Sequence, residues 1–121
     1  MDRRELIRNL TLNQITDLYE NIDQCILRDV KELAAKLGFA VGRSEVVEAL
    51  RGLIRDGLAK ASRFSSFPPH EIKLDGMPDV DAVEVNFSTY FHVTPKGREF
   101  RQSEDFPWPF DNDGNPLIPS P

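Results

Sequence analysis

Apolar residues recur at helical spacing through the first half of the chain. Residues 2–10 predict a short leading helix with Leu6, Ile7 and Leu10 on its apolar side. Thr11 followed by a glutamine three residues later has the pattern of a capping box. The apolar positions behind it share one helical face, which predicts a long helix over residues 12–24; they are Ile15, Leu18, Tyr19, Ile22 and Ile26.

Two further helices are predicted between residues 29 and 57. After a short extended piece at residues 25–28, Asp29 and Glu32 form a second capping-box pattern, and Gly38 ends that helix. Ser44 is predicted to cap a third helix that Gly57 ends. The inward positions of these helices should form one core, made of Leu33, Leu37, Val46, Leu50, Leu53 and Ile54.

The apolar spacing changes to alternation after Gly57. Residues 58–64 and 83–93 predict two strands, the second with regular alternation of apolar and polar positions. Residues 71–74 suggest a short edge strand within the connection. Thr94 and Pro95 then start a last helix that should end near Ser103, because proline is tolerated at a first-turn position.

The chain divides into a domain over residues 1–104, which includes an N-terminal arm, and a tail over residues 105–121. The tail has five prolines among residues 107–121, which excludes a helix or a central strand. Its aromatic residues suggest that part of it lies over an apolar groove of this domain or of a partner. The Asp-rich stretch at residues 111–115 predicts a turn, because the ligand positions of a calcium-binding EF-hand loop are not filled.

Composition predicts an ordinary globular domain in a reducing compartment. The 121 residues are 40% apolar and 29% charged. A single cysteine, Cys25, excludes an internal disulfide, and no apolar run is long enough to span a bilayer. Because the first residues also lack the apolar stretch of a signal peptide, we expect a cytoplasmic protein.

The formal net charge of −5 is spread unevenly. Residues 1–64 carry 11 basic and 10 acidic residues, whereas residues 65–121 carry 4 and 10. Attraction to a phosphate backbone is therefore not expected from the second half of the chain.

The order of predicted elements over residues 12–102 resembles a winged helix-turn-helix. Residues 29–38 look like the first helix of the helix-turn-helix, and residues 50–58 are typical of a recognition helix that runs into the wing. Residues 94–100 are similar to the segment that leaves the wing in MarR- and PadR-type repressors. The resemblance implies an α+β fold: a three-helix bundle, a two- or three-stranded wing and a C-terminal helix. The wing departs from the usual pattern, because it is long and acidic.

The resemblance implies a DNA-binding transcriptional regulator that acts as a dimer on double-stranded DNA. The third helix would enter the major groove, and arginine and serine are suited to base edges and phosphate. The dimer would use residues 1–10, the last helix and the tail. The candidate DNA-binding residues are Arg43, Ser44, Glu45, Glu48, Arg51 and Arg55, together with Lys60 and Arg63 after the helix.

The alternative is a protein-interaction module in which the same scaffold has lost its DNA contacts. In that case the third helix is a solvated face on which arginines pair with glutamates three or four residues away. The two hypotheses differ in surface charge. One contiguous basic stripe favours DNA, and arginines neutralised by Glu45 and Glu48 favour a protein partner.

Neither catalysis nor a cofactor is predicted. His70 and His92 have no metal-ligand spacing with each other or with Cys25. Cys25 ends an apolar stripe and has no base placed beside it by any motif, which favours a core residue over a nucleophile. We therefore expect a protein that is not an enzyme and binds no metal.

Overall fold

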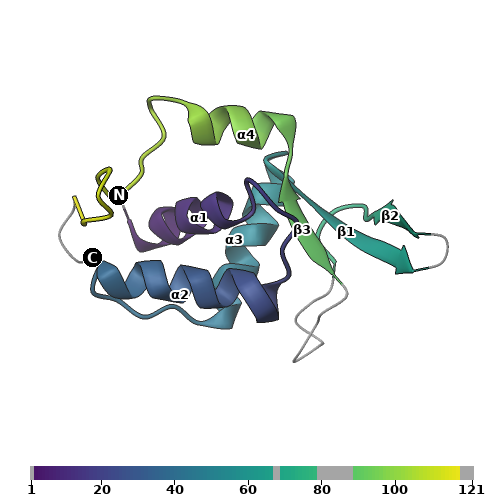
Figure 1. Cartoon of the computed structure of the whole chain (residues 1–121), viewed down its shortest axis with the longest axis horizontal. Coiled ribbons are helices and arrows are strands. Elements are labelled where there is room, and N and C mark those ends of the chain that lie inside the picture. The colour runs from purple at the N-terminus through teal and green to yellow at the C-terminus, as the bar shows by residue number, and fades with distance from the viewer. Residues whose placement is uncertain (1, 67–68, 79–88, 118–121) are drawn as a thin grey trace.

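The computed structural model describes residues 2–66, 69–78 and 89–117. Helices gather on one side of the molecule and a sheet extends from the other (Figure 1). The elements in chain order are helix α1 (Arg3–Gln14), π-helix η1 (Ile22–Ile26), helices α2 (Leu27–Lys36) and α3 (Arg43–Arg55), strands β1 (Ala59–Ser66), β2 (Pro69–Lys73) and β3 (Tyr90–Val93), and helix α4 (Pro95–Gln102).

The sheet of the described residues is antiparallel and has the order β2-β1-β3. Lys60 of β1 pairs with His92 of β3, and Ser62 pairs with Tyr90. On the free side of β3, Phe91 forms a bridge to Glu20, with N–O distances of 2.8 and 3.0 Å. The fold is therefore α+β, with helices packed on a three-stranded antiparallel sheet.

The predicted helix over residues 12–24 is wrong. A single helix, α1, covers Arg3–Gln14, and Asp2 caps it by accepting a hydrogen bond from the backbone N of Glu5 at 2.8 Å. Thr11 lies inside α1, where its hydroxyl donates to the carbonyl of Ile7. α1 ends at Gln14 because the backbone of the next residue pairs with the sheet. The N–H of Val93 in β3 donates to the carbonyl of Ile15 at 3.0 Å.

The extended piece predicted at residues 25–28 is also wrong. η1 occupies residues 22–26 and continues directly into α2. Asn21 provides the cap, since its side-chain oxygen accepts from the backbone N of Gln24 at 2.8 Å. Asp29 therefore lies within α2 and is not its cap. The strand-like pairing occurs at Glu20, outside the predicted segment.

Both predicted glycine stops are confirmed. Gly38 and Gly57 have φ angles of 88° and 76°, the left-handed conformation that glycine adopts without steric cost. The predicted cap of the third helix is wrong, however, because the N-cap of α3 is Gly42. Ser44 lies in the first turn, and Glu45 accepts a hydrogen bond from the Gly42 backbone N at 3.2 Å.

The second half of the described chain follows the prediction closely. β1 and the edge strand β2 lie where strands were expected, and α4 begins with Thr94 as its cap. Of the predicted strand over residues 83–93, residues 83–88 lie outside the described residues. In β3 the alternation is confirmed, because Phe91 and Val93 are buried while Tyr90 and His92 are half-buried.

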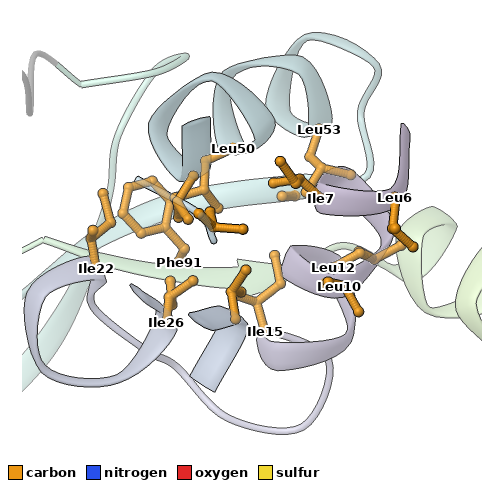
Figure 2. Close-up of a cluster of buried hydrophobic side chains, with 14 of the residues drawn as sticks. Leu6, Ile7, Leu10, Leu12, Ile15, Ile22, Ile26, Leu50, Leu53 and Phe91 are labelled. Carbon is orange, nitrogen blue, oxygen red and sulfur yellow. The ribbon is translucent and has the colours of Figure 1, made fainter. Parts of the chain in front are cut away.

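The core lies between the helices and the inner face of the sheet. Four of the six predicted core residues are fully buried, and Leu33 and Ile54 are partly buried against them. Figure 2 shows Phe91 of β3 among side chains from α1, η1 and α3. α1 contributes four buried side chains to the core, namely Leu6, Ile7, Leu10 and Leu12.

The first part of the tail packs on the domain itself. Phe106 and Phe110 are buried, and Trp108 is partly buried against the same core. The guanidinium of Arg101 in α4 lies 4.8 Å from the ring centroid of Phe106 and 4.7 Å from that of Trp108. Its nitrogens also donate to the side-chain oxygen of Asn13 at 2.8 and 3.0 Å. Arg101 thus joins α4, the tail and the end of α1.

Candidate functional site

Four of the six candidate DNA-binding residues of α3 fall on an exposed stripe, and Arg43 and Glu45 do not. Ser44, Glu48, Arg51 and Arg55 are exposed and spaced at i, i+4, i+7 and i+11, which places them on one face of the helix. The opposite face is buried in the core, as predicted. The third helix therefore presents a polar face to solvent.

Arg43 is the first of the two residues off the stripe. Its guanidinium forms two hydrogen bonds to the carboxylate of Asp23 in η1, at 2.9 and 3.2 Å. The two side chains are only 24% and 11% exposed. A partly buried, bidentate pair of this kind fixes the start of α3 against η1, so Arg43 has a structural role in addition to any contact with a ligand.

Carboxylates also accompany the remaining arginines of α3. Arg51 contacts Glu48 at 3.2 Å, and Arg55 contacts Asp56 at 3.4 Å. Exposed pairs of this kind contribute little to stability, but they reduce the local positive potential. By the criterion of surface charge, α3 does not carry a contiguous basic stripe.

Glu45 pairs with α1, which the sequence did not suggest. Two nitrogens of Arg3 each donate to a different oxygen of Glu45 at 3.0 Å. The hydrogen bond from Arg3 lowers the pKa of the Glu45 carboxyl. At the other end of α3, Arg8 donates to the C-cap residue Asp56 at 2.7 Å and lowers the pKa of that carboxyl.

A groove of about 420 Å³ lies between α1 and α3. Its apolar part consists of Ile7, Ala49 and Gly52. Its charged lining comes from both helices: the arginines are Arg3, Arg4, Arg8 and Arg55, and the acids are Glu45 and Glu48. Ser44 completes it. Four candidate residues, Ser44, Glu45, Glu48 and Arg55, are thus brought together with three arginines of α1.

Sequence reasoning missed the arginines of α1. Arg4 and Arg8 are four residues apart and therefore share a helical face. This spacing was the available signal, but only the packing of α1 against α3 decides that this face borders the third helix.

Lys60 and Arg63 do not join this surface. Lys60 points to the outer face of the sheet, since its neighbours Ala59 and Ala61 are buried on the inner face. There its ammonium lies 5.6 Å above the ring of Tyr19 and 3.7 Å from Glu71. Arg63 is exposed farther along β1, opposite Ile72 of β2.

The outer face of the sheet carries an aromatic cluster. Tyr19 stacks on His92 at 4.4 Å between ring centroids and meets Phe64 edge-on, and Phe64 in turn meets Tyr90. Burial and the nearby Lys60 lower the pKa of His92. The histidine is thus part of a packed cluster and is mainly neutral at pH 7.

The surroundings of Cys25 do not activate its thiol. Burial and the neighbouring Glu20 carboxylate raise the pKa of the Cys25 thiol, which is the reverse of what an activated nucleophile needs. Across residues 2–66, 69–78 and 89–117, no three side chains of His, Cys, Asp or Glu come together in a way that could hold a metal ion. In the same ranges every helix is too short or too polar to span a bilayer.

The surface expected to form a dimer is largely used within the chain. Leu6, Ile7 and Leu10 are buried in the core, as are Phe106 and Phe110 of the tail. A homodimer stays a prediction, and these apolar side chains are not its contact surface in the described fold.

No family model, curated protein or solved structure matches this chain.

Proposed function

We propose that this chain is a non-enzymatic protein-interaction module on a winged-helix scaffold. The order of the elements is compatible with that scaffold, and so is the pairing of Glu20 with β3 between α1 and α2. In this layout α3 takes the place of the recognition helix, and β1 and β3 take that of the wing.

The observation that carries the proposal is that the arginines on and beside α3 form ion pairs within the chain. Arg43, Arg51 and Arg55 each contact a carboxylate, and so do Arg3 and Arg8 of α1. The arginines that line the groove surround an apolar floor. Duplex DNA presents no apolar surface in its phosphate backbone, whereas a protein partner combines apolar and charged groups.

A DNA-binding regulator is the second candidate. The exposed stripe of Ser44, Glu48, Arg51 and Arg55 favours it, because these positions would face the major groove in a docked winged helix. Glu48 weighs against it, since a carboxylate in the middle of the stripe repels phosphate and accepts hydrogen bonds only from a base amino group.

Fluorescence anisotropy with labelled duplex DNA tests the proposal. The probes are a random-sequence duplex and the region upstream of the gene, at about 50 mM salt, where phosphate contacts are strong. We expect no saturation in the range of about 1–100 μM that is usual for non-specific binding. Saturable binding that is lost in Arg51→Ala and Arg55→Ala, and kept in the α2 variant Arg28→Ala, would overturn the proposal in favour of the regulator.

A further inference from the structure

We propose that the groove between α1 and α3 binds an acidic amphipathic helix of a partner protein. This inference rests on the proposed function and assigns the chemistry of the partner. The groove is defined by its apolar floor of Ile7, Ala49 and Gly52 and by the charged residues of α1 and α3 around it.

The shape of the groove suits a helix. Two helices packed side by side leave a furrow in which a third helix buries side chains at i, i+3, i+4 and i+7. α1 has 12 residues and is therefore about 18 Å long, which matches about three turns of a partner helix. The apolar floor provides the surface against which the partner's apolar stripe would be removed from water.

The charge of the groove selects an acidic partner. Four arginines and two glutamates line it, in a chain whose net charge is −5. Arg3 and Arg8 are held by Glu45 and Asp56, whereas the exposed Arg4 makes no ion pair or hydrogen bond with any described residue. Arg4 is thus available to a carboxylate of the partner.

Gly52 gives an independent indication that the floor is kept open. A Cβ at this position would meet only the guanidinium ends of Arg55 and Arg8, at 3.6 and 3.7 Å, which is ordinary van der Waals contact. A glycine inside a helix is destabilising relative to alanine, so the fold gains nothing from it. The two guanidinium ends are the far ends of flexible side chains, which can move aside for an apolar side chain of the partner.

The same features favour a protein over nucleic acid at this groove. Glu45 and Glu48 lie on its lining, where they would repel phosphates. A partner helix can place neutral or basic residues opposite the two glutamates and acidic residues opposite Arg4.

The experiment uses two labelled peptides and the full chain. Each peptide is a helix of about 18 residues with leucines at i, i+3, i+4 and i+7, long enough to be helical in part. One carries glutamates beside the leucines and the other carries lysines at the same positions. Anisotropy should show saturable binding of the glutamate peptide and at least about tenfold weaker binding of the lysine peptide.

Two variants locate the binding. Arg4→Glu should weaken the glutamate peptide about tenfold, while Lys31→Glu, the same charge change on exposed α2, should leave its affinity unchanged. Gly52→Leu should block both peptides without lowering the cooperativity of thermal unfolding, because its side chain fills the groove and not the core.

Each other outcome overturns the inference. Equal binding of the two peptides, or no effect of Arg4→Glu, excludes charge selection at this groove. Binding of neither peptide and of no duplex excludes the inference alone and leaves the proposed function in place. Duplex binding that Arg4→Glu abolishes excludes both the inference and the proposed function.

Discussion

Arginines lie beside apolar or aromatic side chains on two sides of α1, but only one of these sides is covered by another part of the chain. On the side of α4, the guanidinium of Arg101 contacts the rings of both Phe106 and Trp108 and donates to Asn13. On the side of α3, arginines of α1 surround an apolar floor that includes Ile7. The tail fills the first side with its own aromatic residues, as its course beside α1 and α4 in Figure 1 indicates, whereas the second side stays open as a groove.

Two helical glycines mark this difference. A Cβ on Gly97 of α4 would lie 2.0 Å from the carbonyl oxygen of Leu58 and 2.6 Å from a methyl of Val93, whereas one on Gly52 of α3 would make only ordinary contacts. Gly97 is therefore required for packing inside the chain, and Gly52 is not. One interface of α1 is thus complete within the chain, and the other is available to a partner.

The largest effect is expected from Gly97→Ala. The added methyl would clash with the backbone of Leu58, which cannot move aside as a flexible side chain can, so α4 and the tail should separate from β1. We expect a loss of about 4 kcal/mol or more in the free energy of unfolding, measured by urea denaturation. A loss below about 1 kcal/mol would mean that α4 is not seated as the structure has it.

Phe106→Ala should cost about 3 kcal/mol. The ring of Phe106 in the tail is buried against Phe100 of α4, and its removal leaves a cavity and withdraws one of the two rings beside Arg101. Circular dichroism melts give the stability. If the change is nearly neutral, the tail does not close this side of α1.

Arg101→Ala should cost about 1–2 kcal/mol, through the loss of two cation–π contacts and of the hydrogen bonds to Asn13. Trp108 is the one tryptophan of the chain, so its emission reports the tail directly. In the Arg101→Ala variant we expect the emission of Trp108 to shift to longer wavelength at temperatures at which the far-ultraviolet circular dichroism of the helices is unchanged. Coincident transitions would show that the tail unfolds only together with the domain.

Gly52→Ala should have the opposite sign and raise stability by about 0.5–1 kcal/mol, because alanine restricts the unfolded chain and fits the groove without strain. It is the matched control for Gly97→Ala. A destabilisation would show that the floor of the groove is closed.

The smallest effect concerns pH. Arg3 lowers the pKa of Glu45, so the carboxylate stabilises the fold above the usual glutamate pKa of about 4.3, and this contribution is lost as the pH falls below that value. Both side chains are more than a third exposed, which keeps the effect small. Glu45→Gln should lower stability slightly at pH 7 and match the wild type at pH 3. A constant difference between the two proteins at both pH values would contradict this.

Local signals in the sequence determined a large part of this fold. Gly38 and Gly57 end α2 and α3 because their backbone conformation is costly for other residues, and Thr94 caps α4 within its own first turn. The inward face of α3 and the alternation in β3 follow from the spacing of apolar residues alone. Each of these features depends on neighbours within a few positions.

The tertiary structure decided what depends on distant partners. α1 ends at Gln14 because β3 binds the backbone of Ile15, 78 residues before Val93 in the chain, and no local pattern records that pairing. Likewise, the packing of the helices decides that Arg43 forms an ion pair with Asp23 and that Arg3 and Arg8 line the groove. The spacing of charges along a helix fixes which residues share a face, but only the packing of the helices determines what that face meets.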